Sequence, residues 1–338
     1  MRYNFIQSPK MSLKIIKAGI LDTIQDGGRN SFRHLGINPS GAMDRFSAQL
    51  SYALLGKKLE EPVIEMHFPA SAFVFQQATI ACLAGADFSA TINCRDIPLH
   101  QPFLVTANSE LKFTRLVKGA QCYLSVLHGL HVDEWLHSAS TNLKATAGGW
   151  KGRRLIKDDY IPYKENLGIG HLPTKYPLSI LHWKTAPLRV DKNIECIKGN
   201  EWNWLTPQAK LNFESSVFSI SNLSDRMGYR LFGEELIAEK KDQLVSSAVD
   251  FGTIQLLPNG QLIVLMADHQ TTGGYPRLAH VSSTSLSSLA QLRPNDEIRF
   301  RFITLEQAED NLIQQQKYLA QLQNACKLKI ENLLHAAM

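Results

Sequence analysis

The residue types best suited to chemistry lie in one stretch, from Met266 to Pro276. This stretch follows an apolar run and combines the carboxylate of Asp268 with hydroxyls, two adjacent glycines and a Tyr-Pro pair. Adjacent glycines permit positive φ angles or close approach of the backbone to a ligand, and their N–H groups can bind an anion. A tight connection turned by Gly-Gly and capped by Asp268 explains the same residues equally well. The candidate catalytic residue here is Asp268, and the candidate ligand-binding residues are Thr271, Thr272, Gly273, Gly274 and Tyr275.

A second candidate loop, residues 39–44, precedes a helix that apolar residues at four-residue spacing predict from residue 46. Ser40 or Gly41 is the expected N-cap, which places Asp44 in the first turn, where the helix dipole favours an anion. That role is structural and needs no catalysis. As a functional loop, the segment offers Asp44 as a catalytic carboxylate, Ser40, Gly41 and Met43 as ligand contacts, and the preceding segment adds the cation Arg29.

A third loop pairs Asp225 with Arg226 ahead of a glycine, between two predicted strands. In a structural interpretation, Asp225 turns the chain and Arg226 faces water. Further along, Asn259-Gly260 between two β runs predicts a hairpin, and that hairpin delivers Asp268 to its far end. Loops on a rigid scaffold commonly carry function, so we expect these distant loops to converge on one polar cleft.

The elements that position these loops are predicted to be mainly β. Residues 63–126 contain many short apolar runs separated by turn clusters, which favours a barrel or sandwich over βαβ units. The expected organisation is an N-terminal β domain (13–165), a proline-containing linker (166–187), a second β domain (188–303) and a C-terminal helix (304–338).

The C-terminal helix is predicted from a seven-residue repeat formed by Leu305, Leu312, Leu319, Cys326 and Leu333. Polar residues interrupt the second apolar column that a coiled coil would need beside this repeat. We therefore expect this stripe to pack on the body of the protein or against a partner helix, which would allow self-association.

Composition narrows the function classes. The chain has 338 residues, is 44% hydrophobic and 20% charged, and carries a net charge of +5 that is dispersed, unlike that of nucleic-acid binders. No apolar run approaches the length of about 18 residues that spans a membrane, and the first ten residues do not resemble a signal peptide. Five scattered cysteines are typical of a reduced, cytoplasmic protein. His128, His131 and His137 lack the pattern of a metal site, so no metal is predicted.

Several motifs are missing from the sequence. It contains no P-loop to hold ATP, no G-x-S-x-G elbow, no Rossmann fingerprint and no Ala-Met-Lys-Met segment for biotin attachment. Loops rich in Asp, Arg, Ser, Thr and Gly on β domains fit recognition of a small polar, amide-like ligand.

Four motifs occur in the order seen in one family: Gln25–Arg29, Pro39–Asp44, Ser224–Gly228 and Thr271–Pro276. With them the chain resembles the family that provides the C subunit of bacterial ATP-dependent 5-oxoprolinases, also called the KipA-like or allophanate hydrolase subunit 2-type family. The same module forms part of the carboxyltransferase of biotin-dependent urea carboxylase. The resemblance runs from about Ile16 to Phe302, with two departures: His269 replaces a common arginine, and Pro294-Asn295-Asp296 replaces Pro-Gly-Asp.

The resemblance implies two β-barrel-type domains, of which the second is cyclophilin-like. It also implies that the chain functions only together with two sister proteins, the B and A subunits. It implies an enzyme that converts 5-oxoproline to glutamate with ATP as a co-substrate of the complex and with no biotin on this chain. Two other functions share these motifs: a carboxyltransferase component that works with carboxybiotin, and a KipA-like regulator that sequesters a kinase inhibitor.

In the enzyme interpretation, Arg29, Arg226 and the Gly273-Gly274 amides would stabilise developing negative charge. Asp44, Asp225 and Asp268 would orient the arginines or transfer protons. Ser40, Thr271, Thr272 and Tyr275 would position the ligand. Whether ATP or the lactam meets this chain stays open.

Overall fold

The computed structural model describes residues 11–169, 177–186, 189–240 and 244–335. Its contacts divide the chain into two compact units. The N-terminal unit takes its described residues from 1–27, 46–188 and 318–338, and the barrel unit takes them from 28–45 and 189–317. The two units therefore do not follow each other along the sequence. Residues 28–45 were expected in the N-terminal domain but belong to the barrel unit. Parts of the expected linker (170–176 and 187), the expected start of the second domain at 188 and the last three residues lie outside the described residues.

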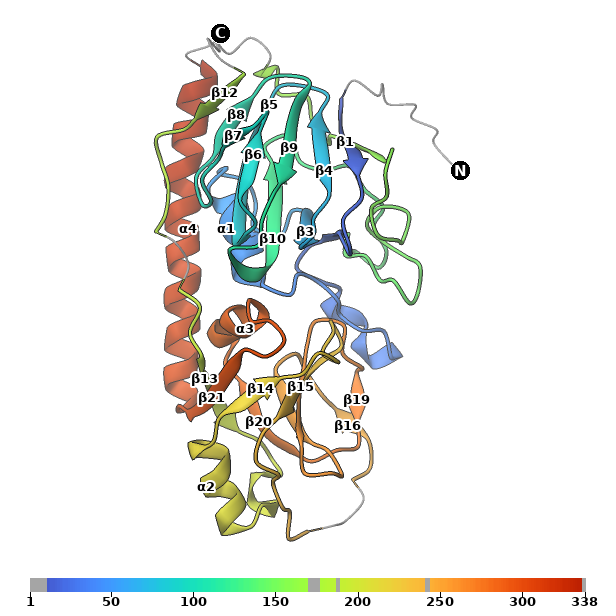
Figure 1. Cartoon of the computed structure of the whole chain (residues 1–338), viewed down its shortest axis with the longest axis vertical. Helices are drawn as coiled ribbons and strands as arrows, with labels where there is room; N and C mark the ends of the chain where they lie inside the picture. Colours follow the sequence, from blue (N-terminus) through green and yellow to red (C-terminus); the bar gives the residue numbers. More distant parts are fainter. Residues whose placement is uncertain (1–10, 170–176, 187–188, 241–243, 336–338) are drawn as a thin grey trace. The chain divides into compact units, whose positions relative to one another are not determined.

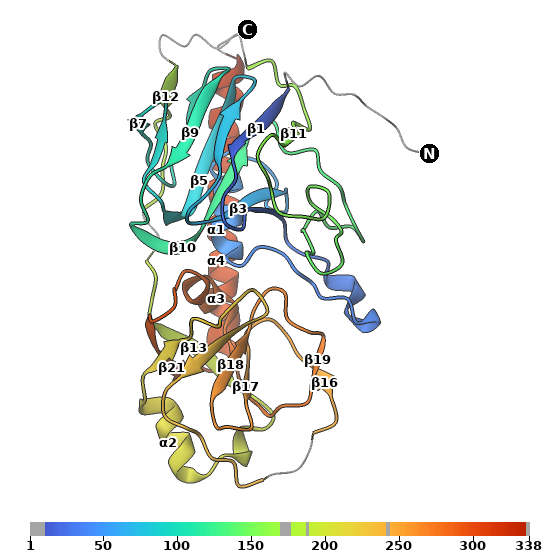
Figure 2. The ribbon, with the colours of Figure 1, turned by 45° about the vertical axis from the view of Figure 1, so that its right-hand side comes forward.

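The N-terminal unit is built from two six-stranded sheets (Figures 1 and 2). In spatial order, the first contains β11 (Tyr160–Pro162), β1 (Ser12–Lys17), β4 (Ala72–Phe75), β9 (Ser109–Phe113), β6 (Ala90–Ile92) and β7 (Arg95–Asp96). The second contains β12 (Leu178–Ile180), β8 (Phe103–Val105), β5 (Thr79–Asp87), β10 (Lys118–Val126), β3 (Val63–His67) and β2 (Thr23–Gln25). Strand β12 lies within the expected linker and pairs antiparallel with β8.

One hydrophobic core joins the two sheets. Ile15 and Phe73 of the first sheet and Leu83 and Leu124 of the second are fully buried in the same cluster. Alternate residues of a strand face opposite sides of a sheet, which explains why these apolar positions recur with period two. The arrangement is the sandwich alternative of the sequence prediction, and the mainly β fold is confirmed.

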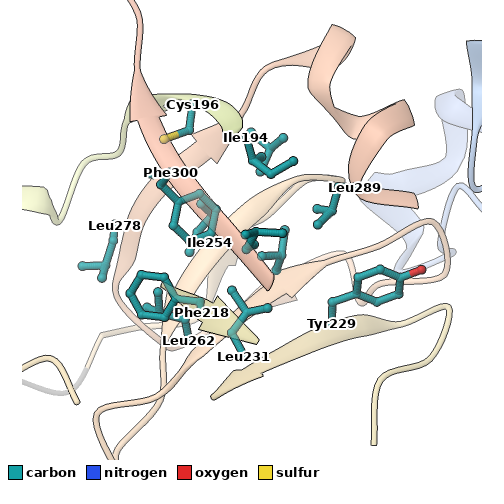
Figure 3. Close-up of a cluster of buried hydrophobic side chains, with 14 of the residues drawn as sticks. Ile194, Cys196, Phe218, Tyr229, Leu231, Ile254, Leu262, Leu278, Leu289 and Phe300 are labelled. Atoms are coloured by element: carbon teal, nitrogen blue, oxygen red, sulfur yellow. The ribbon is translucent and has the colours of Figure 1, made fainter. Parts of the chain in front are cut away.

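The barrel unit is organised around a closed seven-stranded barrel, in the order β13 (Asn193–Lys198), β20 (Arg277–Val281), β17 (Thr253–Leu256), β18 (Leu262–Leu265), β15 (Gly228–Phe232), β14 (Phe218–Ile220) and β21 (Glu297–Phe302). Figure 3 shows side chains from these strands filling its interior, among them Ile254, Leu231 and Phe300. The predicted Asn-Gly hairpin is confirmed, because β17 and β18 pair with Leu256 opposite Leu262.

Shorter elements complete this unit. A two-stranded sheet joins β16 (Ser247–Ala248) to β19 (Thr272–Gly273). The helices are η1 (Asn30–Leu35), η3 (Trp202–Trp204), α2 (Pro207–Ser215) and α3 (Ser283–Ala290).

The helix that follows the second candidate loop is α1 (Arg45–Ala53), and it begins later than the N-cap prediction requires. Ser40 and Gly41 have φ angles of 57° and 98°. An N-cap residue has extended backbone, so these left-handed residues form a turn ahead of the helix and do not cap it. Asp44 immediately precedes the first helical residue.

The C-terminal helix, α4 (Leu305–His335), confirms the predicted seven-residue stripe in part. Leu319, Cys326 and Ile330 are buried, whereas Leu305 is exposed. Within the N-terminal unit, Gln323 of α4 donates a hydrogen bond to the carbonyl of Lys57 at 2.8 Å. This part of the stripe therefore packs on the body of the protein. Across the described residues, no helix combines the length and apolar character needed to cross a membrane.

Candidate functional site

Asp268 is the centre of a polar network in the barrel unit. Its carboxylate accepts hydrogen bonds from Arg226 Nε at 2.8 Å, from Arg226 Nη2 at 3.3 Å and from the hydroxyl of Ser40 at 2.7 Å. Arg226 Nη2 also donates to the carbonyl of Gly41 at 2.7 Å. Ser40 is fully buried and Arg226 is 8% exposed. Residues of the three candidate loops therefore meet at one carboxylate.

The strand register explains how this pairing arises. Strands β15 and β18 are antiparallel with Gly228 opposite Leu265, so the residue before one strand and the residue after the other lie at the same end of the barrel. The backbone N–H of Asp268 donates to the carbonyl of Arg226 at 2.7 Å and continues this pairing past the strand ends. The barrel scaffold thus places the Arg226 and Asp268 side chains beside each other.

Segment 40–45 is attached to the barrel at further points. Asp44 is 1% exposed, and its carboxylate accepts a hydrogen bond at 2.8 Å from Nε2 of Gln291, the residue that directly follows α3. The guanidinium of Arg45 lies 5.3 Å from the ring centre of Phe251. Met43, expected to contact a ligand, is instead part of the hydrophobic core of the barrel unit, because its apolar side chain is 1% exposed among core residues.

Arg29 is among the largest fully buried side chains, so it does not face solvent. Its backbone N–H donates to the carbonyl of Pro39 at 2.8 Å. Next to it, Gly28 has a φ of +86°, and a Cβ there would lie 2.9 Å from the carbonyl oxygens of Pro39 and Ser40. Only glycine fits this close approach, so Gly28 keeps the first and second motifs together.

The Thr-Thr-Gly-Gly segment serves mainly as structure. Thr272 and Gly273 form β19 and pair with β16, and the carbonyl of Thr271 accepts a hydrogen bond from Val249 at 3.2 Å. Neither Gly273 nor Gly274 has a positive φ. A Cβ on Gly273 would lie 2.7 Å from Gln255 Nε2, so this glycine is needed for a close approach to a side chain of its own chain.

Asp225 and Tyr275 line a cavity of about 530 Å³. Gln255 and Arg230 also line this cavity, and sequence reasoning missed both. A polar residue inside an apolar strand, as Gln255 is within residues 253–257, was the available signal. Asp225 Oδ1 accepts hydrogen bonds from the backbone of Met227 at 2.8 Å and of Gly228 at 3.2 Å, which is the turn-forming role.

His269, the departure from the family pattern, is fully buried beside Asp268. Its Nδ1 lies 2.6 Å from the carbonyl of Gln270, and burial lowers the pKa of its imidazole. Its Nε2 lies 3.9 Å from Asp250, a residue that pairs with Arg33 at 3.0 Å. The ring supports the loop after β18.

The network can hold a guanidinium in a fixed direction. Asp268 accepts three side-chain hydrogen bonds, so its carboxylate orients Arg226, and this geometry favours the orienting role over proton transfer. Among the described residues, no group of three or more His, Cys, Asp or Glu side chains is arranged to hold a metal ion.

Residues 35–302 match the family described as the carboxyltransferase domain, subdomain A and B. Because this match covers more than half of the sequence, the chain belongs to the carboxyltransferase-domain family. The fold agrees: the solved structure of the K. lactis urea amidolyase has a TM-score of 0.82 at 22% identity. That likeness covers 92% of this chain and 20% of the larger one.

Two curated relatives match over almost their whole length. The C subunit of the 5-oxoprolinase of Escherichia coli (strain K12) is 33% identical over 320 residues, which is 95% of this chain and 100% of the relative. The C subunit of the 5-oxoprolinase of Haemophilus influenzae is 32% identical over 300 residues, which is 89% of this chain and 94% of the relative.

Proposed function

We propose that this chain is the C subunit of an ATP-dependent 5-oxoprolinase, which opens 5-oxo-L-proline to L-glutamate with hydrolysis of ATP. The chain is expected to work in the cytoplasm with the B and A subunits and to be inactive alone. Similarity to two relatives of that name, at 33% and 32% identity, supports the assignment. The structural observation that carries it is the buried Ser40–Asp268–Arg226 network.

Such a network suits the chemistry of lactam opening. An amide is a poor electrophile at neutral pH. In the complex, ATP would transfer its γ-phosphoryl group to the amide oxygen and release ADP. Water would then attack the activated carbon, the ring C–N bond would break, and the phosphoryl group would be released to water as phosphate. Negative charge then grows on oxygen atoms at the reacting carbon, and a preorganised cation stabilises that charge most effectively. Arg226, fixed by Asp268 and by the carbonyl of Gly41, supplies a positive charge whose direction is set before the ligand arrives.

A carboxyltransferase component of a biotin-dependent urea or amide carboxylase is the second candidate. The family description and the urea amidolyase fold favour it. It requires a biotin carboxylase and a biotin carrier, whereas the 5-oxoprolinase requires neither. A KipA-like regulator, the third function that shares these motifs, would catalyse nothing.

One assay separates the candidates. The chain is combined with the A and B subunits, biotin is omitted, and ATP hydrolysis is measured with and without 5-oxo-L-proline. We expect ATP hydrolysis that depends on 5-oxoproline and stoichiometric formation of glutamate. No stimulation by 5-oxoproline, together with urea-dependent turnover when a biotin carboxylase and a carrier are supplied, would replace the proposal with the second candidate. No turnover in either mixture would point to the regulator.

A further inference from the structure

The cavity beside Asp225 lies on the outer surface of the barrel, across three neighbouring strands. Alternate residues of β15, β18 and β17 point to opposite sides of the wall. Tyr229 and Val264 face the core, while Arg230, Ile263 and Gln255 line the cavity. The three cavity-lining positions have the alternation that the strands impose, so the cavity is built from regular structure.

Gln255 is the polar group that marks this cavity as a binding site. Its side chain is fully buried, and its Oε1 has no hydrogen-bond partner in the described part of the chain. Among the residues that the structure describes, its Nε2 makes only a long hydrogen bond of 3.4 Å to the carbonyl of Tyr275. A buried acceptor without a partner destabilises the fold, and a ligand N–H that reaches it removes that penalty.

Gly273 keeps Gln255 in place. A Cβ at position 273 would lie 2.7 Å from Gln255 Nε2 and 3.4 Å from Val249 Cγ1. Any larger residue would therefore displace the carboxamide from its present position. The glycine of the family motif thus gives the Gln255 carboxamide the room it needs beside the cavity.

The charges of the lining select the ligand. Arg230 is an exposed guanidinium on the cavity, and within the described ranges it makes no ion pair. The lining contains one other charged side chain, Asp225, which caps the backbone of its own turn. A triphosphate carries several negative charges and would meet a single cation here, whereas one carboxylate matches one guanidinium.

Apolar side chains form another part of the lining. Met227, Ile263 and Leu265 contribute side chains to the lining, next to the carboxamide and the guanidinium. Small-molecule sites commonly combine such an apolar wall with a few polar groups that fix orientation. A compact ring can cover this wall while its polar edges meet Gln255 and Arg230.

We propose that this cavity binds a small cyclic amide that carries a carboxylate. The amide N–H donates to Gln255 Oε1, the carboxylate pairs with Arg230, and the ring packs on Ile263 and Leu265. The choice of 5-oxo-L-proline as the ligand rests on the proposed function, while the ligand class rests on the cavity. The proposal assigns the lactam, and not ATP, to this chain.

Ligand-observed NMR titration of the full chain tests this assignment with four probes. 5-Oxo-L-proline should bind most tightly. 2-Pyrrolidone lacks the carboxylate and L-proline lacks the amide carbonyl, so each should bind about tenfold or more weakly, and ATP should not compete. Equal binding of L-proline and 5-oxoproline, displacement by ATP, or no binding of any amide would overturn the proposal.

Variants locate the site. Arg230→Gln should weaken 5-oxoproline about tenfold to a hundredfold and leave 2-pyrrolidone unchanged, because it removes one charge-assisted contact from an exposed position. Arg95→Gln, on an exposed strand of the N-terminal unit, is the matched control and should change neither. Gln255→Met should weaken both lactams. If Gln255→Met does not fold, Arg230→Gln decides, and unaltered 5-oxoproline binding in it contradicts the proposal.

Assays of the reconstituted complex distinguish a failure of the proposed function from a failure of the cavity assignment. An active complex in which Arg230→Gln raises the KM for 5-oxoproline and leaves the KM for ATP unchanged supports both. An active complex with an unchanged KM for 5-oxoproline overturns the cavity assignment alone. An inactive wild-type complex together with Arg230-dependent binding of 5-oxoproline overturns the proposed function and leaves the cavity assignment standing.

Discussion

Asp268 holds Arg226 through both carboxylate oxygens, at 2.8 Å from Nε and 3.3 Å from Nη2. The two residues are 42 positions apart in the sequence and are brought together by the end of an antiparallel strand pair. Ser40 adds a third hydrogen bond from a segment that lies 228 positions from Asp268. The arginine is therefore held from several directions, and its orientation does not depend on a single contact.

Asp268→Asn tests this network. The change keeps the size of the side chain and removes its charge, so the buried Arg226 loses its ion pair with Asp268. We expect a loss of about 3 kcal/mol in the free energy of unfolding and a fall of about a hundredfold in turnover of the reconstituted complex. Chemical denaturation and the coupled ATPase assay measure these quantities.

The matched control for this change is Asp158→Asn. Asp158 is exposed and lies 3.5 Å from Lys14 in a surface ion pair. Such pairs contribute about 0–1 kcal/mol, so stability and turnover should remain near the wild-type values. Assembly of each variant with its partner subunits is verified by size-exclusion chromatography. Wild-type turnover in an assembled Asp268→Asn complex would refute the functional role of the network.

Gly28→Ala should destabilise the barrel unit more than Gly36→Ala. Both glycines have positive φ angles, +86° and +78°, so each substitution has the cost of a left-handed alanine, about 1 kcal/mol. The new Cβ at position 28 would also press on two carbonyl oxygens at 2.9 Å, whereas nothing lies within 4 Å at position 36. We expect an extra loss of about 1–2 kcal/mol for Gly28→Ala. Equal midpoints in urea denaturation would argue against this close contact.

His100 should make stability depend on pH. Burial lowers the pKa of this histidine from 6.5 to about 4, and its Nε2 accepts a hydrogen bond from the backbone of Gly85 at 3.2 Å, which requires the neutral ring. The unfolded chain binds a proton as the pH falls below 6.5, while the folded chain does not until about pH 4. The contribution of His100 to the free energy of unfolding is therefore fully present above pH 6.5 and is lost on acidification. The free energy of unfolding should fall by about 2 kcal/mol between pH 7 and pH 5.

His100→Gln should show a shallower decline in the free energy of unfolding over that interval, measured by denaturant titration at several pH values. The exposed His34 gives the matched control, since His34→Gln removes a histidine without removing a buried ring. An unchanged pH profile in His100→Gln would assign the acid sensitivity to other groups.

Helix α4 offers a matched pair of leucines. Leu319 is 1% exposed, whereas Leu328 is 62% exposed on the same helix. Leu319→Ala should reduce the free energy of unfolding by about 2–4 kcal/mol, because it leaves a cavity, and Leu328→Ala should change it by less than about 0.5 kcal/mol. Thermal unfolding of both variants checks this difference. Similar Tm values would show that the stripe does not stabilise the fold, and a changed elution volume only in Leu328→Ala would show that its exposed face mediates self-association.

Local patterns in the sequence predicted much of the fold. The Asn259-Gly260 hairpin, the helix after Asp44 and the C-terminal helix each depend on neighbouring residues, and each forms within a few residues of the predicted place. The convergence of the Ser40, Arg226 and Asp268 loops was also predicted, from charged and hydroxyl residues in loops on a rigid β scaffold.

Other features depend on distant parts of the chain and left little trace in the sequence. The grouping of residues 28–45 with the barrel follows from hydrogen bonds such as that between Gln291 and Asp44, 247 positions apart. Met43 resembles a loop residue in sequence and becomes core only because the barrel supplies its neighbours. The roles of Gln255 and Arg230 appear only when three strands align side by side.

The membership of residues 28–45 in the barrel unit has a consequence for biosynthesis. A ribosome releases this segment early, yet its partners Arg226 and Gln291 emerge 185 and 247 residues later. The segment must wait through nearly the whole of translation before it can dock, so the barrel matures only after the chain is almost finished. A truncated protein of residues 189–317 alone would likewise lack residues 28–45. It would therefore lack Met43, which packs in the hydrophobic core of the barrel unit.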